Sequence, residues 1–314
     1  MGDYKIGLAL GAGSARGWAH IGVLRALAEA GIQPDIVAGT SVGALVGGCY
    51  VAGELDALEQ FARDLTRRKV LGFLDFNFSG SGLIHGQRLR DVLEKRLKDI
   101  AIEALAKRFV AVATEIGSGH ETWLARGHLG DAIRASYAMP GIFKPVRIEG
   151  RWLFDGALVN PVPVSICRAL GARYVIAVNV NSDAGHGAVV TDLNALPIAA
   201  LPPPEEQGLL ARNGRAVKKL LQRQFFGQVE NGPGISTVMV QAFNIVQDRI
   251  ARSRLAGDPP DVMISPRLPA IGLFDFHRAD ELIECGAAAV RREVEHIKHE
   301  IVTRNFNSIL ARAG

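Results

Sequence analysis

The chain has 314 residues, of which 48% are hydrophobic and 22% are charged. This length and composition support one large hydrophobic core or two smaller ones and exclude a disordered or fibrous protein. The 36 lysines and arginines only slightly outnumber the 32 aspartates and glutamates. The excess is too small to predict nucleic-acid binding, although it suits an anionic membrane surface or an acidic substrate. The 35 glycines follow no collagen repeat and therefore indicate tight turns and close backbone approaches.

Cysteine usage and the apolar runs bear on the cellular compartment. Cys49, Cys167 and Cys285 lie far apart, without a CxxC pair or a Cys/His cluster, which predicts a reducing compartment, no disulfide framework and no structural zinc. The first residues lead directly into an apolar segment without the regions of a signal peptide, and no apolar run reaches the roughly 18 residues of a membrane-spanning helix. We expect a cytoplasmic protein without metal or cofactor, with at most peripheral contact with the inner membrane face. The sequence does not indicate the oligomeric state.

Strand and helix patterns alternate at the start of the chain. Residues 6–10 predict a short buried strand, and the glycine-rich stretch 11–17 leads into a helix that Gly31 ends. Residues 35–38 predict a second strand, and a helix follows over 44–52. Two strand–turn–helix units in succession favour a parallel sheet that helices cover on both faces.

The rest of the chain continues this pattern. Further strands are predicted over 109–114, 174–180 and 261–264, helices over 88–98, 129–137, 162–170, 214–226, 236–254 and 278–302, and a long loop over 181–206. The sequence shows no internal repeat and no sharp change in composition. We therefore expect a single domain over 1–314, with a motif-bearing core at about 5–180 and a helical C-terminal part at about 207–314.

The segment Gly39-Thr40-Ser41-Val42-Gly43 has the form G-x-S-x-G and lies between a predicted strand and a predicted helix. In this position the turn is tight enough to strain the serine and to require minimal side chains at Gly39 and Gly43. The Ser41 hydroxyl then lies at a helix N-terminus, where the dipole favours developing negative charge. Ser41 is therefore a candidate nucleophile, whereas the plainer interpretation is a glycine-rich start of a helix.

The loop Gly11–Gly17 allows two interpretations. A dinucleotide fingerprint would require glycine where Arg16 stands, and the acidic residue of the next strand, Asp35, lies at its start rather than at its far end. Alternatively, the backbone amides near Gly13 and Ser14 form a preorganised site for an oxyanion, with Arg16 adding charge or holding the loop.

A nucleophilic serine needs a base. A Ser-acid-His order would require His186, His277, His296 or His299. A carboxylate that acts directly is the alternative: Asp155 follows an apolar run and precedes Gly156 and Ala157, as a carboxylate at the end of a strand would. A turn aspartate is the plainer interpretation of the same residues.

Four motifs in this order resemble those of the patatin-like phospholipase family, including its bacterial branch related to neuropathy target esterase. They span about residues 5–180 and are residues 11–17, residues 39–43, Ser136-Tyr137-Ala138-Met139-Pro140-Gly141-Ile142-Phe143, and Asp155-Gly156-Ala157 with Asn160-Pro161-Val162-Pro163. The resemblance implies a three-layer α/β/α fold with a mainly parallel central sheet, and a lipid acyl hydrolase that cleaves phospholipids, lysophospholipids or similar acyl esters.

The same resemblance implies roles for individual residues. Ser41 would be the nucleophile and Asp155 the general base of a Ser–Asp dyad, without histidine or metal. Gly13 and Ser14 would supply oxyanion amides in a loop that Arg16 supports, although Ala12 and Ser14 stand where the commonest family loop has glycine. A catalytically weak relative with a binding or regulatory role, and an esterase with a Ser-His-Asp triad, are the alternatives.

Contact with lipid calls for a docking surface. Arg67, Arg68 and Lys69 precede an aromatic and aliphatic run over 70–78, and residues 212–226 mix basic with large apolar side chains. Both patterns are typical of interfacial docking segments, and both also fit ordinary core packing beneath a basic face.

Overall fold

The computed structural model describes residues 4–67, 70, 96–97, 99–181, 228–229, 232–233, 235–269, 271–272 and 275–313. Residues 1–183 and 247–314 form one compact unit, and residues 184–246 form a second. Within the second unit the structure describes the short strands β8 (Gln228–Val229) and β9 (Gly232–Pro233) and the first part of α9 (Ile235–Gly257). The predicted helix over 214–226 and nearly all of the elements predicted over 88–98 and 181–206 lie outside the described residues, and the single domain over 1–314 stays a prediction.

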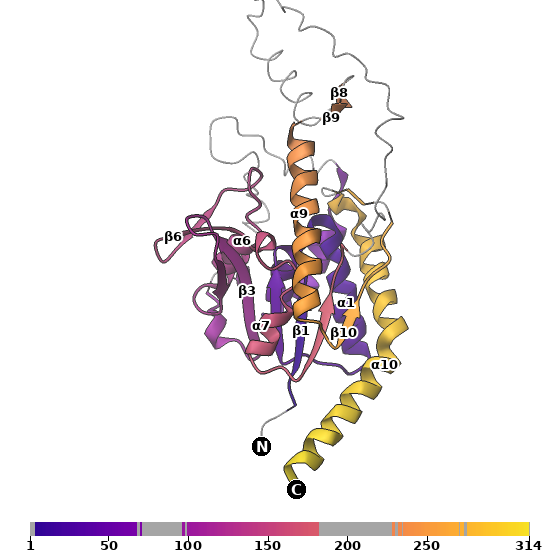
Figure 1. The fold of residues 1–314 in the computed structure, drawn as a ribbon. Helices are drawn as coiled ribbons and strands as arrows, with labels where there is room; N and C mark the ends of the chain where they lie inside the picture. Colours follow the sequence, from indigo (N-terminus) through magenta and orange to yellow (C-terminus); the bar gives the residue numbers. More distant parts are fainter. Residues whose placement is uncertain are drawn as a thin grey trace, which may run out of the picture. The chain divides into compact units, whose positions relative to one another are not determined.

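A mainly parallel sheet forms the centre of the first unit (Figure 1). Its parallel strands lie in the order β10 (Val262–Ile264), β7 (Tyr174–Val178), β1 (Ile6–Leu10), β2 (Ile36–Thr40) and β3 (Arg108–Glu115). Beyond β3, β6 (Arg151–Asp155) pairs antiparallel with β3, and β5 (Val146–Ile148) pairs antiparallel with β6. β4 (Glu121–Leu124) pairs antiparallel with β3 from its other side. The parallel strands are almost wholly apolar and buried because helices cover both of their faces.

Helices cover both faces of this sheet (Figure 1). One face packs against α1 (Ala19–Glu29), α2 (Val42–Val51), α3 (Leu55–Arg63), α6 (Leu129–Ser136) and α10 (Ala279–Ala313). The other face packs against α7 (Val164–Ala169) and against Ala251 of α9. The expected three-layer α/β/α fold is confirmed.

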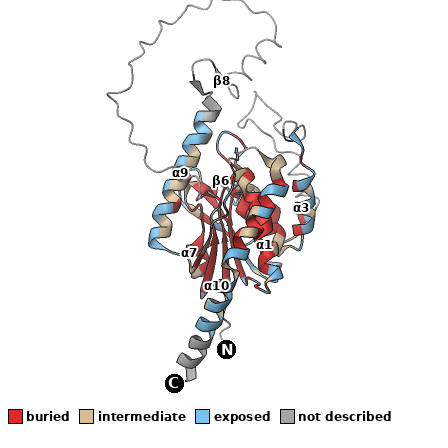
Figure 2. Cartoon of the chain, turned by 90° about the vertical axis from the view of Figure 1, so that its right-hand side faces the viewer, coloured by how far each residue is buried: buried red, intermediate tan, exposed pale blue. Residues whose placement is uncertain are grey.

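Helices α1 and α10 touch through their backbones. A Cβ atom at Gly22 would lie 1.8 Å from the Ile283 carbonyl oxygen, and one at Gly286 would lie 1.9 Å from the Ala19 carbonyl oxygen. Glycine at both positions therefore lets the two helices approach as closely as they do. Farther along α10 most of the described side chains are half-buried or exposed (Figure 2), and Val302 is 68% exposed.

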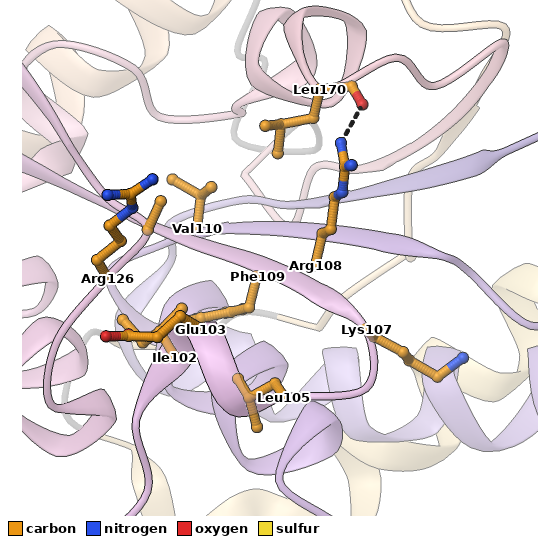
Figure 3. Close-up of a pocket in the computed structure, with 10 residues that line it drawn as sticks. Ile102, Glu103, Leu105, Lys107, Arg108, Phe109, Val110, Arg126 and Leu170 are labelled. Atoms are coloured by element: carbon orange, nitrogen blue, oxygen red, sulfur yellow. Dashed lines mark hydrogen bonds between the residues drawn. The ribbon is translucent and has the colours of Figure 1, made fainter.

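A pocket of about 300 Å³ opens at the amino end of β3 (Figure 3). Its lining includes Lys107 and Arg108, which donate to the carbonyl oxygens of Pro34 (2.9 Å) and Leu170 (3.1 Å) respectively. Arg126 is a third cationic side chain in the lining, which also contains apolar side chains such as that of Val110. Because the strand continues to Glu115, this pocket lies at the opposite end of β3 from the turn that contains Ser41.

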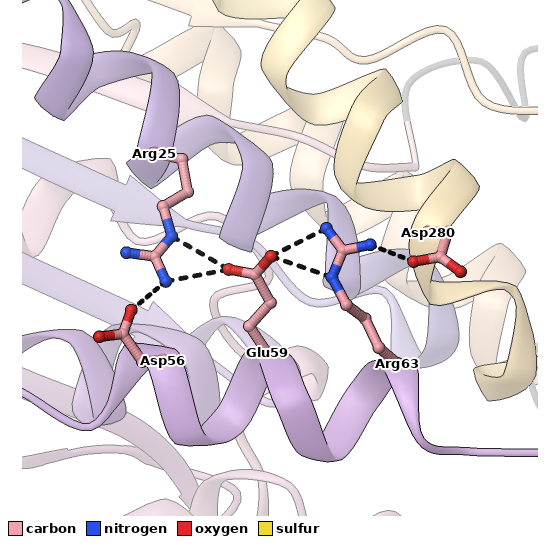
Figure 4. A network of polar contacts seen from close by, with 5 residues as sticks. All are labelled: Arg25, Asp56, Glu59, Arg63 and Asp280. Carbon is pink, nitrogen blue, oxygen red and sulfur yellow. Dashed lines mark hydrogen bonds and ion pairs between the residues drawn. The ribbon is translucent and has the colours of Figure 1, made fainter.

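A network of charged side chains joins three helices on the surface (Figure 4). Glu59 of α3 accepts hydrogen bonds from Arg25 of α1 (3.0 and 2.9 Å) and from Arg63 (3.0 and 2.8 Å). Arg25 also pairs with Asp56, and Arg63 pairs with Asp280 of α10. Burial opposes ionisation of Glu59, but the two arginines prevail and hold its pKa below the usual range.

Several boundaries differ from the predicted ones for identifiable reasons. The predicted helix over 162–170 is shorter, as α7, because Pro163 directly precedes its first residue. The strand predicted over 174–180 ends at Val178, since the Asn181 amide donates to Asn179 Oδ1 and turns the chain. The helix predicted over 278–302 continues to Ala313. Strands β4 and β5 and helix α3 have short or polar patterns that the sequence analysis did not identify.

Candidate active site

Ser41 and Asp155 meet because two strands share one edge of β3. β2 pairs with β3 up to Thr40 opposite Val112, and β6 pairs with it from Ala113 opposite Asp155 onward. β4 pairs with Ala111–Thr114 of β3, a range that overlaps the parts paired with β2 and with β6. β4 therefore lies along one edge of β3, and β2 and β6 lie end to end along the other. The carboxyl end of β2 therefore faces the carboxyl end of β6, which places Ser41 beside Asp155.

Ser41 has a backbone conformation that is rare for a residue with a side chain. Its φ of 57° and ψ of −123° correspond to about 1–3 kcal/mol of local strain. The two flanking glycines permit the turn: a Cβ atom at Gly43 would lie 2.1 Å from the Leu10 carbonyl oxygen, and one at Gly39 would lie 2.5 Å from the Gly43 carbonyl oxygen. The strained serine and the need for minimal neighbours are thus as the G-x-S-x-G pattern predicts.

Asp155 is fully buried and holds the Ser41 hydroxyl. Ser41 Oγ donates to Asp155 Oδ2 at 2.7 Å, and the Ala157 amide donates to Asp155 Oδ1 at 2.9 Å. Burial raises the pKa of Asp155 to about 7, although both hydrogen bonds favour the ionised form and lower it. A carboxylate with a pKa near neutrality is well suited to accept and return a proton.

Backbone and side-chain contacts from other segments hold this pair. The Ser41 amide donates to Ser136 Oγ at 2.9 Å, and the Asp155 amide donates to the Ala138 carbonyl oxygen at 3.0 Å, so one segment holds both residues. Thr114 Oγ1 donates to the Asp155 carbonyl oxygen at 2.9 Å. The third motif in the sequence contained Ser136, but the sequence analysis gave it no role, and it missed Thr114 because nothing local marks a single threonine within a strand.

The loop Gly11–Gly17 follows β1, and its second half lies in the 3₁₀ helix η1 (Ser14–Trp18). The Ala12 amide donates to the Pro161 carbonyl oxygen at 2.9 Å. Ser14 has a φ of 50°, in the left-handed region that favours glycine, the residue that the resemblance leads one to expect at this position. Gly13 is buried, and among the described residues its amide donates no hydrogen bond.

The loop contacts the side chains of Asn181 and His20. Arg16 Nη1 donates to Asn181 Oδ1 at 2.9 Å, and Asn181 Nδ2 donates to the Ala12 carbonyl oxygen at 2.9 Å. His20 lies fully buried with Nε2 at 2.7 Å from the Gly11 carbonyl oxygen. Burial lowers the pKa of His20 to about 4, so the ring is neutral and its Nε2–H donates to that carbonyl. The sequence analysis missed both contacts.

The histidines weighed as alternative bases have other surroundings. His277 accepts a hydrogen bond from Arg67 Nε at 3.0 Å, and His296 and His299 lie exposed on α10. His186 lies outside the described residues. Within the part of the chain that the structure describes, the Ser41 hydroxyl is bonded to a carboxylate and to no imidazole.

The two predicted lipid-docking segments lie largely outside the described residues. Of the segment 67–78 the structure describes Arg67 and the buried Val70, and the segment 212–226 is not described. No group of three or more His, Cys, Asp or Glu side chains suited to a metal ion occurs among the described residues. No described helix combines the length and apolarity needed to cross a membrane.

Comparisons with known proteins identify the family of this chain. A family model described as patatin-like phospholipase matches residues 8–168, a range that contains the Gly11–Gly17 loop, Ser41 and Asp155. The chain belongs to the patatin-like phospholipase family. An uncharacterized NTE family protein of Mycobacterium tuberculosis is 33% identical over 329 residues, which cover 93% of this chain and 91% of the relative.

Eukaryotic relatives of this patatin-like protein are much longer. Lysophospholipase nte1 of Emericella nidulans is 26% identical over 306 residues, covering 94% of this chain and 18% of that protein. Neuropathy target esterase sws of Drosophila melanogaster is 33% identical over 184 residues, covering 57% of this chain and 13% of that protein. This patatin-like chain therefore corresponds to a limited segment of each.

Proposed function

We propose that this patatin-like protein is a serine lipid acyl hydrolase that cleaves the carboxylic esters of phospholipids, lysophospholipids or similar acyl lipids. The observation that carries the proposal is the 2.7 Å hydrogen bond from Ser41 Oγ to Oδ2 of the fully buried Asp155. Family membership and the lysophospholipase among the relatives support the substrate class. In this scheme Ser41 is the nucleophile and Asp155 the general base.

Acylation begins when Ser41 Oγ attacks the carbonyl carbon of the ester and its proton passes to Asp155 Oδ2. The carbonyl oxygen becomes an oxyanion, and the tetrahedral intermediate then collapses. The bond to the alcohol breaks, and the leaving oxygen takes the proton from Asp155. The products are the free alcohol, such as a glycerol derivative, and an acyl-Ser41.

Deacylation repeats these steps with water as the nucleophile. Water gives a proton to Asp155 and attacks the acyl carbonyl carbon. When the second tetrahedral intermediate collapses, the Ser41 oxygen leaves and recovers the proton, and the fatty acid is released. Asp155 alternates between its ionised and neutral forms, which a pKa of about 7 permits near neutral pH.

The oxyanion would be held by the loop Gly11–Gly17 and by the start of α2. The Gly13 amide, which donates no hydrogen bond among the described residues, is the first candidate donor, and Ser14 is the second. Arg16 supports the loop through Asn181. Ser41 precedes the first residue of α2, so the helix dipole also favours negative charge there.

We further propose that the protein is cytoplasmic and meets its lipid at an anionic membrane surface. The small excess of positive charge and the basic, apolar patterns over 67–78 and 212–226 support this proposal.

The substrate class can be tested by measuring hydrolysis of phospholipids, lysophospholipids and short p-nitrophenyl esters by the wild type and by Ser41→Ala. We expect fatty acid release from at least one lipid class, and its loss in Ser41→Ala. A wild type that hydrolyses none of them would contradict the enzymatic proposal and favour a binding or regulatory role.

A further inference from the structure

Asn181 joins the two ends of the loop Gly11–Gly17. It follows β7, and its carboxamide makes two different bonds: Nδ2 donates to the Ala12 carbonyl oxygen at 2.9 Å, and Oδ1 accepts from Arg16 Nη1 at 2.9 Å. A carboxamide donates at one end and accepts at the other, and the two bonds fix its orientation. Asn181 is itself held, because its amide donates to Asn179 Oδ1 at 3.0 Å.

The bond to Ala12 completes a series of anchors. The backbone groups of residues 11 and 12 are each bonded to a different part of the fold: Gly11 N–H to the Val178 carbonyl oxygen, the Gly11 carbonyl oxygen to His20, Ala12 N–H to the Pro161 carbonyl oxygen, and the Ala12 carbonyl oxygen to Asn181. The next group along the chain is the Gly13 amide, which donates no hydrogen bond among the described residues. Asn181 therefore fixes the peptide unit that carries this amide.

We infer that Asn181 is a positioning residue for ester hydrolysis: its carboxamide ties the Ala12 carbonyl to the Arg16 guanidinium and so holds the Gly13 amide in place for the oxyanion. This inference rests on the proposed function. Preorganised donors stabilise a developing charge without reorganising during the reaction, so loss of the tie lowers kcat and leaves substrate binding nearly unchanged.

Two substitutions separate the two ends of the carboxamide. Asn181→Asp keeps the size and the acceptor for Arg16, but it places an oxygen opposite the Ala12 carbonyl oxygen. Asn181→Ala removes both bonds. We expect each to lower kcat for a p-nitrophenyl ester by about 10- to 100-fold, with KM changed by less than about threefold and the midpoint of the pH profile unchanged. Asn305→Ala, at an exposed position on α10, is the matched control and keeps wild-type kinetics.

A double-mutant cycle tests whether Arg16 and Asn181 act as one unit. Because both hold the same loop, Arg16→Ala combined with Asn181→Ala should lower kcat no further than the more damaging single substitution, within about threefold. Circular dichroism and thermal unfolding identify variants that do not fold, and Asn181→Asp is decisive if Asn181→Ala does not fold.

Three results would overturn the inference. Wild-type kcat in Asn181→Asp would show that the tie to Ala12 has no role, and multiplying losses in the double variant would show that Arg16 and Asn181 act independently. A wild type inactive toward every ester would remove the proposed function together with this role. That outcome is distinct from an active wild type with unaffected Asn181 variants, which would remove only the role of Asn181.

Discussion

Asp155→Asn should abolish activity and yet stabilise the protein at alkaline pH. Burial raises the pKa of Asp155 from 3.8 to about 7, so the folded state holds the neutral carboxyl more strongly than the unfolded chain does. The corresponding stability is fully present below about pH 4 and is lost as the pH rises through about 7. At roughly 1.4 kcal/mol per pKa unit, keeping Asp155 ionised at pH 8 costs the folded state about 4 kcal/mol.

Asparagine avoids this cost because it has no charge to bury. Its side-chain oxygen can still accept from the Ala157 amide, the bond that Asp155 Oδ1 makes at 2.9 Å. Urea unfolding of Asp155→Asn and the wild type, measured from pH 5 to pH 8, should show the variant gaining about 2 to 3 kcal/mol relative to the wild type over this range. Asp258→Asn, at an exposed position, is the control and should show no such gain. A difference that is constant with pH would refute the account of a buried carboxylate with a raised pKa.

Three further predictions concern the pH dependence of activity, the tight turn at Gly43 and the ion pairs of Glu59. The kcat/KM of the wild type should rise about tenfold from pH 6 to pH 8 with a midpoint near 7, since Asp155 must be ionised to act as base; a midpoint near 4 would contradict this. Gly43→Ala should lower activity at least about 100-fold, because its Cβ would lie 2.1 Å from a backbone oxygen, whereas Gly117→Ala, whose Cβ meets nothing within 4 Å, should keep wild-type activity. Glu59→Gln should lower the free energy of unfolding by about 1 kcal/mol at pH 7. Because the folded-state pKa of Glu59 is depressed, urea unfolding should show this loss fading as the pH falls through that pKa, and a loss that persists at lower pH would refute the ionic account.

Sequence patterns predicted the parallel part of the fold because those strands are buried on both faces and therefore read as short apolar runs. The helix after the first loop also ends where Gly31, with a φ of 75°, interrupts it. Strand β5 has only three residues, Val146–Ile148, with one side chain exposed, so its pairing with β6 rather than its own pattern defines it. The two strands are neighbours in the chain, since Ile148 lies opposite Arg151 across the turn Glu149-Gly150, where both residues have a positive φ. Glutamate is unusual at such a position, so the sequence of this turn gives a weaker hairpin signal than Asn-Gly or Asp-Gly would.

The candidate site likewise contains residues that the sequence indicates and residues that it does not. Ser41 and Asp155 are recognisable because each lies in a turn with small neighbours, and the backbone geometry requires those neighbours. Ser136 and Thr114 each make one side-chain hydrogen bond across the fold, and Asn181 makes two. A serine, threonine or asparagine in isolation gives no signal of such contacts. His20 resembles any helical histidine until its burial and its bond to Gly11 are known.

Covalent labelling tests the central claim most directly. A fluorophosphonate probe should modify the wild type, and peptide mapping by mass spectrometry should place the adduct on Ser41. Ser41→Ala should not be labelled, Asp155→Asn should be labelled at least about 100-fold more slowly, and His277→Ala should be labelled at the wild-type rate. An unlabelled wild type, or an adduct on another residue, would contradict the role of Ser41; labelling of Asp155→Asn at the wild-type rate would contradict the dyad alone.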